Sequence, residues 1–149
     1  MGPKTHRLEA AFREMLDVPH AVAVNSCTAA IHLALIGLGI GPGDEVVTTP
    51  LSFATTANVL VHVRATPVFA DVEPDTLNLD PAAVAACIGP RTKAIMPVHL
   101  HGHPCDMDAL RALADRHGLL KIEDAAHAIE ATYHGRKMGA DSSAAAFSF

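Results

Sequence analysis

Two adjacent acids close an apolar segment near the C-terminal end of the sequence, and a histidine follows soon after them. The segment reads Ile122-Glu123-Asp124-Ala125-Ala126-His127. A carboxylate at the end of a buried strand needs a cation or several donors, and ligands of open α/β sheets bind beyond the carboxyl ends of the strands. Asp124 is therefore a candidate partner for a protonated ring nitrogen of a cofactor, with His127 as a second contact. The structural alternatives are a helix cap for Asp124 and a surface side chain for His127.

A second candidate site lies where an apolar helix is expected to begin, after Asn25-Ser26-Cys27-Thr28. Free backbone N–H groups and the positive end of a helix dipole bind phosphate at such a position. The structural alternative is that Ser26 or Thr28 only caps the helix. Phe53 follows the next expected strand, where its ring either stacks on a planar cofactor or belongs to the core. The sequence contains neither the Walker motif nor the dinucleotide glycine motif.

Three histidines at alternate positions support a second hypothesis, a metal-dependent hydrolase. His99, His101 and His103 follow an expected strand, and histidines at a strand end can bind a catalytic metal. Asp124 and His127 would then supply further ligands. A glycine and a proline among the histidines indicate that the strand has already ended, which argues against a shared face for the three rings.

Composition excludes several classes of function. The chain has 149 residues, 50% of them hydrophobic, which is enough for one domain with a core. The net charge of −5, the lack of a Lys/Arg cluster and the absence of tryptophan argue against nucleic acid or an anionic membrane as a partner. The first residues lack an apolar signal core, and no apolar run has the length of a membrane span. Three cysteines without C-x-x-C spacing fit a reducing compartment, so we expect a cytoplasmic protein.

Helical and strand patterns alternate along the whole chain. This alternation predicts βαβ units, and therefore an α/β protein of three layers, α/β/α, with a mostly parallel sheet and helices on both faces. Helices are expected at 5–16, 29–38, 53–63, 81–87 and 106–117, and strands at 21–24, 45–49, 67–71, 93–98, 119–123, 130–134 and 144–149.

Seven segments spread over the chain share their sequence pattern with one enzyme family. They are Asn-Ser-Cys-Thr-Ala-Ala-Ile-His-Leu-Ala-Leu at 25–35, Gly-Pro-Gly-Asp-Glu-Val-Val at 41–47, Asp-Thr-Leu-Asn-Leu-Asp at 75–80, Arg-Thr-Lys-Ala-Ile-Met-Pro-Val-His-Leu at 91–100, Pro-Cys-Asp-Met-Asp at 104–108, Ile-Glu-Asp-Ala-Ala-His at 122–127 and Ala-Ala-Ala-Phe-Ser-Phe at 144–149. Together they resemble the DegT/DnrJ-type sugar aminotransferases, which are fold-type I enzymes that use pyridoxal 5′-phosphate. The resemblance implies amino transfer from a glutamate-like donor to a nucleotide-linked keto-sugar, in enzymes that are expected to be homodimers.

The same resemblance implies a phosphate site for the cofactor. Thr28 and Ala29 would bind the phosphate at the helix N-terminus, and Ser148 would add its hydroxyl. Cys27 stands where the relatives usually have glycine. If that position requires a positive φ, cysteine would be strained there and phosphate binding would be weakened.

The resemblance also implies three contacts to the cofactor ring. Phe53 would stack on the pyridine, and Asp124 would pair with its protonated nitrogen, which keeps the ring an electron sink. His127 would contact the ring hydroxyl, at a position where relatives carry Gln or His.

One catalytic residue of the family is missing from the sequence. Relatives form the Schiff base with a lysine a few positions after the serine that matches Ser148, which places that lysine beyond Phe149. Lys93, Lys121 and Lys137 are better explained as surface charges. We therefore expect 1–149 to be part of the large cofactor-binding domain, without the small C-terminal domain, and not to transaminate alone. The alternative is a non-catalytic fragment that binds cofactor weakly or pairs with another chain.

Overall fold

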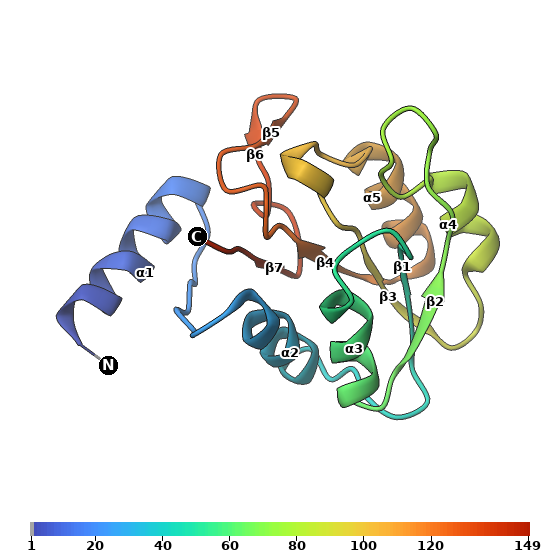
Figure 1. Cartoon of the computed structure of the whole chain (residues 1–149), viewed down its shortest axis with the longest axis horizontal. Helices are drawn as coiled ribbons and strands as arrows, with labels where there is room; N and C mark the ends of the chain where they lie inside the picture. Colours follow the sequence, from blue (N-terminus) through green and yellow to red (C-terminus); the bar gives the residue numbers. More distant parts are fainter. Residues whose placement is uncertain (1) are drawn as a thin grey trace.

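A parallel sheet of five strands, in the order β2-β1-β3-β4-β7, forms the centre of the computed structural model, which describes residues 2–149 (Figure 1). All four pairings within this sheet are parallel, which confirms the expected α/β architecture. A short 3₁₀ helix, Leu100–Gly102, follows β3. The helices are α1 (Pro3–Leu16), α2 (Cys27–Gly37), α3 (Thr55–His62), α4 (Pro81–Cys87) and α5 (Met107–His117). The strands are β1 (Glu45–Thr48), β2 (Thr66–Phe69), β3 (Thr92–Met96), β4 (Leu120–Asp124), β5 (Thr132–Tyr133), β6 (Arg136–Lys137) and β7 (Ala144–Ala146).

Local capping signals explain the limits of two helices. α4 begins after Asp80 and α5 after Asp106, and each carboxylate accepts a backbone N–H of the first helical turn, at 2.8 Å and 3.1 Å. Pro81 is the first residue of α4, where its missing N–H costs nothing. Gly118, with φ +66, ends α5 in the left-handed conformation. Within residues 2–149, none of the helices has the length and apolar character needed to cross a membrane.

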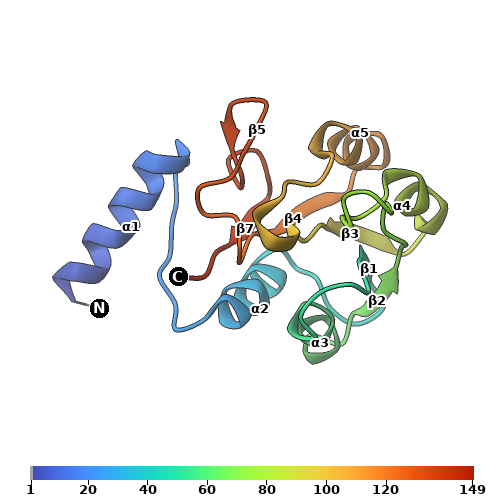
Figure 2. The ribbon, with the colours of Figure 1, turned by 45° about the horizontal axis from the view of Figure 1, so that its top comes forward.

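Helices cover both faces of the sheet. In Figure 2, α2 and α3 lie on one side of the sheet and α4 and α5 lie on the other. Two adjacent residues of β1 show the same division, because their side chains point to opposite faces. Val46 packs in a core with residues of α2 and α3, whereas Val47 packs in a core with residues of α4 and α5. Both valines are fully buried, so the three-layer prediction is confirmed.

The segment at 21–24 is not the buried strand that its sequence predicts. It is extended but pairs with no strand within the described residues, and Val22 is 72% exposed. Alternating alanine and valine favour an extended backbone, but a strand also needs a neighbour for its N–H and C=O groups. The Ala23 N–H instead donates to the Glu9 carboxylate of α1 at 3.0 Å.

The last two expected strands are also shorter than predicted. In the final segment only Ala144–Ala146 pairs with β4. In the preceding one only Thr132–Tyr133 is a strand, and it pairs antiparallel with Arg136–Lys137 in a hairpin outside the main sheet. His134 and Gly135 form the turn, and both have positive φ, which is the geometry of a tight two-residue hairpin.

Candidate functional site

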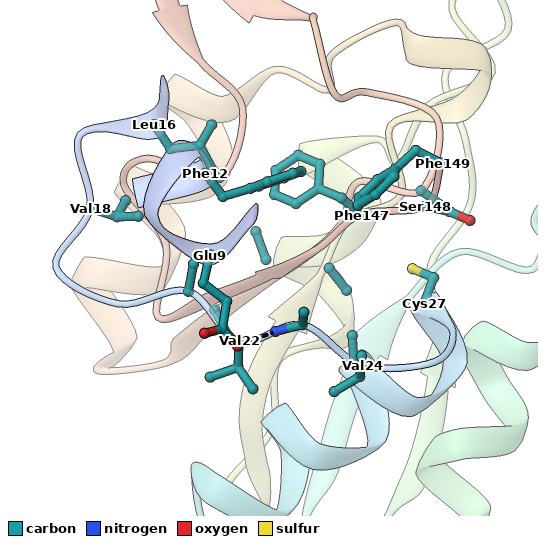
Figure 3. Close-up of a pocket in the computed structure, with 18 of the residues that line it drawn as sticks. Glu9, Phe12, Leu16, Val18, Val22, Val24, Cys27, Phe147, Ser148 and Phe149 are labelled. Atoms are coloured by element: carbon teal, nitrogen blue, oxygen red, sulfur yellow. Dashed lines mark hydrogen bonds between the residues drawn. The ribbon is translucent and has the colours of Figure 1, made fainter. Parts of the chain in front are cut away.

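A pocket of about 860 Å³ lies between α1, the extended segment before α2, and the end of the chain after β7. Figure 3 shows Val22, Val24 and Cys27 on one side of this pocket and Phe147, Ser148 and Phe149 on the other. Four of the six residues predicted to bind a cofactor line it; they are Thr28, Phe53, His127 and Ser148. All four are exposed, and the Phe53 ring is 80% exposed, so it is not the core residue that was the alternative for it.

Ser26 is the N-cap of α2, at the edge of the pocket. Its hydroxyl accepts the Ala29 N–H at 3.1 Å, so the capping alternative is confirmed for Ser26. The cap engages the Ala29 N–H that the family resemblance assigns to phosphate. Cys27 is the first helical residue and is not among the residues with positive φ. The strain expected from cysteine in place of glycine is therefore absent.

The thiol of Cys27 is held in its protonated form. Burial raises the pKa of Cys27 to about 12, and the charge of Asp124 contributes in the same direction. Since the thiolate is the nucleophile, we expect iodoacetamide to alkylate Cys27 at pH 8 more than about 100 times more slowly than it alkylates free cysteine. Peptide mapping by mass spectrometry would measure the rate at Cys27 separately from the other two cysteines. Alkylation at the rate of free cysteine would contradict this expectation.

Asp124, at the end of β4, is buried behind the pocket and has a hydroxyl partner. Its Oδ2 accepts the Thr56 hydroxyl of α3 at 2.9 Å, and its Oδ1 accepts the Ala126 N–H at 3.3 Å. The Ser52 hydroxyl lies 2.9 Å from that of Thr56. Asp124 does not line the pocket, but its charge acts on Cys27, which does. In the sequence, Thr56 is marked only as a threonine four residues after Ser52 in an apolar helix.

The neighbouring acid, Glu123, belongs to a separate buried cluster. The His99 ring accepts the Cys105 N–H at Nδ1 (3.2 Å), which places its proton on Nε2, and Nε2 donates to Glu123 Oε2 at 3.0 Å. The Gly139 N–H donates to the same carboxylate at 2.7 Å, and the Ser142 hydroxyl also donates to it. Burial raises the pKa of Glu123, but the hydrogen bonds from His99, Ser142 and Gly139 outweigh burial and leave that pKa below its ordinary value.

The three alternate histidines do not share a face. His99 is fully buried in the cluster with Glu123, whereas His101 and His103 are exposed. No group of three or more His, Cys, Asp or Glu within residues 2–149 is arranged to hold a metal ion, so the ligand set of the hydrolase hypothesis is not formed. The His101 ring is instead stacked parallel to the His127 ring, with centroids 5.9 Å apart. A Cβ on Gly102 would lie 2.8 Å from the His127 carbonyl oxygen, so these two turns are in backbone contact.

A sequence model of the DegT/DnrJ/EryC1/StrS aminotransferase family matches residues 1–149. The chain belongs to this family.

Curated relatives of the chain include a polysaccharide biosynthesis protein and a GDP-perosamine synthase. The chain is 55% identical to the spore coat polysaccharide biosynthesis protein SpsC of Bacillus subtilis over 148 residues. This match covers 99% of the chain and 38% of SpsC. The chain is 53% identical to the GDP-perosamine synthase of Caulobacter vibrioides over 95% of this chain and 38% of that enzyme. The chain thus spans about two fifths of the length of these relatives.

Solved structures agree with the fold of the chain. DesV of S. venezuelae superposes with a TM-score of 0.96 at 51% identity, covering 99% of this chain and 40% of DesV. The PLP form of the putative sugar aminotransferase Spr1654 of Streptococcus pneumoniae superposes with a TM-score of 0.96 at 34% identity, covering 100% of this chain and 42% of Spr1654. A form of Spr1654 with the amine form of the cofactor, PMP, has also been solved.

None of the residues lining the pocket is a lysine. Lys121 forms an ion pair with Asp115 at 2.8 Å, Lys137 is in the β5–β6 hairpin, and Lys93 is exposed on β3. These positions agree with the surface roles predicted for all three.

Proposed function

We propose that the chain is part of an aminotransferase that uses pyridoxal 5′-phosphate and moves an amino group from a glutamate-like donor to a nucleotide-linked keto-sugar. The observation that carries this proposal is the buried carboxylate of Asp124 behind a pocket whose edge bears Phe53, His127 and the N-terminus of α2. Family membership supports it, as do the PLP and PMP forms of the Spr1654 structure and the name of the GDP-perosamine synthase. Residues 1–149 would be part of the large cofactor-binding domain.

The donors around the pocket fit a phosphorylated, cationic ring. Thr28 and Ser148 place two exposed hydroxyl-bearing residues on the pocket, beside the positive end of the α2 dipole. Ser26 competes with phosphate for the Ala29 N–H, so the phosphate contact of Ala29 requires this N–H to leave the cap or to be shared. Thr28 and Ser148 are thus the stronger part of the proposed phosphate site.

When bound, the pyridine ring of the cofactor acts as an electron sink for the carbanion of amino transfer. Asp124 would hold the proton at the ring nitrogen, because an ionised carboxylate in a buried site favours a cationic partner. Phe53 would stack on one face of the ring, and His127 would contact its hydroxyl. Since no lysine lines the pocket, we propose that the 149 residues hold the cofactor without a covalent bond and do not turn over substrate.

Two further parts of the proposal concern the whole protein. We propose that it works as a homodimer, which agrees with the apolar residues Leu33, Ile36 and Val61 exposed on α2 and α3. We also propose that it is cytoplasmic, which agrees with its three free cysteines.

Replacement of Asp124 tests the proposed cofactor site. Titration of the 149-residue chain with PMP, followed by ligand fluorescence, should show binding that Asp124→Asn weakens by about 10- to 100-fold, the effect of losing one hydrogen bond between charged groups. Asp115→Asn, which removes an exposed carboxylate on α5, is the matched control and should bind like the unmodified chain. Equal affinity of the Asp124→Asn and Asp115→Asn variants would refute the assignment.

A further inference from the structure

Two linked hydroxyl groups, the buried one of Thr56 and the half-buried one of Ser52, lie next to Asp124 on the side of α3. Thr56 is 2% exposed, and its hydroxyl is 2.9 Å from Asp124 Oδ2 and 2.9 Å from the Ser52 hydroxyl. An ionised carboxylate only accepts hydrogen bonds, so Thr56 must donate its single proton to Asp124. Ser52 must then donate to Thr56. The result is an ordered chain of donors, Ser52 to Thr56 to Asp124, in which each bond polarises the next.

The two oxygens of Asp124 accept hydrogen bonds from different partners. Oδ2 accepts the Thr56 hydroxyl, whereas Oδ1 accepts, among residues 2–149, only the long 3.3 Å bond from the Ala126 N–H. Oδ1 therefore keeps the larger remaining capacity to accept a hydrogen bond. The rotation of the carboxylate is fixed because one of its oxygens is tied to a different element of the fold.

The backbone of Asp124 is fixed as well. Its N–H donates to the Pro97 carbonyl at 2.9 Å, and its carbonyl accepts the His99 N–H at 3.1 Å. With the main chain held by the loop after β3, the side-chain torsions are the remaining freedom of Asp124. Thr56 restricts them, and restriction of this kind lowers the cost of orienting a charged group for its ligand.

Packing alone does not require a hydroxyl at position 56. Val59 and Leu60, on the same helix, are fully buried and apolar, and valine has nearly the shape of threonine. We infer that Thr56, backed by Ser52, is a positioning residue that holds Asp124 in the orientation that receives the cofactor ring nitrogen. This inference rests on the proposed cofactor role of Asp124.

The test compares three variants in PMP titrations of the 149-residue chain. Thr56→Val removes the hydroxyl and should weaken PMP binding by about tenfold, the effect of one hydrogen bond to a charged group. It should also reduce the circular dichroism induced in the bound PMP, because a freely rotating carboxylate holds the ring less uniformly. Thr56→Ser keeps the hydroxyl and should restore both readouts. Ser52→Ala removes the second donor and should weaken binding by about threefold, a smaller effect that follows from the cooperativity of the pair.

Thr55→Val is the matched control, since Thr55 is the adjacent threonine at the start of α3 and should show affinity and dichroism like those of the unmodified chain. If Asp124→Asn weakens binding but Thr56→Val does not, the positioning inference is overturned and the cofactor site stands. If Asp124→Asn leaves binding unchanged, the cofactor site itself fails. Should Thr56→Val not fold, Ser52→Ala decides, because weakened binding supports the inference and unchanged binding overturns it.

Discussion

Replacing His99 with leucine is expected to lower the free energy of unfolding by about 2–4 kcal/mol at neutral pH, because the buried Glu123 carboxylate loses a hydrogen-bond donor while it remains desolvated. Both side chains of the His99–Glu123 pair are fully buried. Leucine has a similar volume, so the loss reports the missing hydrogen bonds more than a cavity. The Cys105 N–H also loses its acceptor on the His99 ring, which adds a second unpaired polar group. Urea denaturation at pH 7 would measure the loss.

The pH dependence of the unfolding free energy shows whether the loss in the His99→Leu variant comes from Glu123. With His99 present, the pKa of Glu123 is below its ordinary value, so the ionised carboxylate stabilises the fold above that ordinary value and the stability is lost as pH falls through the lowered pKa. Without His99, burial raises the pKa of Glu123 with less opposition. A raised carboxyl pKa stabilises the fold at low pH and this stability is lost as pH rises. The difference between the two proteins should therefore shrink as pH falls toward 4.5, the ordinary value for glutamate.

His103→Leu is the matched control for this prediction, because His103 is exposed and its replacement should change the free energy of unfolding by less than about 0.5 kcal/mol. Equal losses for the His99 and His103 variants, or a loss at His99 that does not depend on pH, would contradict the role assigned to the buried pair.

Replacing Gly139 with alanine is expected to cost about 2–4 kcal/mol of unfolding free energy, from backbone strain and overpacking together. Gly139 has φ +86, a conformation that alanine adopts only at a cost. The added Cβ would also lie 2.8 Å from the Ala145 Cβ and 2.9 Å from the Phe147 ring. Relief of this contact requires a shift of β7 or of Gly139, whose N–H donates to Glu123. Thermal and urea unfolding would measure the loss.

The Gly135→Ala variant separates the cost of backbone strain from the cost of overpacking. Gly135 has a similar φ of +79, but nothing lies within 4 Å of an added Cβ there. Its replacement should cost only the backbone strain, about 1–2 kcal/mol. The additional loss at Gly139 then measures the clash with β7. Identical losses for both variants would show that β7 adjusts freely and that the contact at Gly139 is unimportant.

The sequence predicted much of the fold because its signals are local. Asp80, Asp106 and Gly118 mark helix limits through hydrogen bonds and dihedral angles within a few residues, and alternating helical and strand patterns imply a parallel sheet. The segment at 21–24 shows the limit of such reasoning. Its pattern is the same whether or not a neighbouring strand is present, so the pattern cannot report pairing.

The sequence marks candidate site residues by their local position and misses those whose contacts are with distant parts of the protein. Asp124 and Phe53 follow apolar strands, and that position alone marks them. Thr56 reaches Asp124 across 68 residues of sequence, and no local pattern encodes such a contact. His99 is a candidate metal ligand in the sequence, and the fold shows instead that its ring donates to Glu123.

Gly102 allows the turn after β3 to touch the backbone of the turn that contains His127. Because there is no side chain between Gly102 and the His127 carbonyl, a displacement of either turn presses directly on the backbone of the other. The stacked rings of His101 and His127 add a second point of contact. The two turns are therefore packed as one unit, and any displacement of His127 would press on the turn that follows β3.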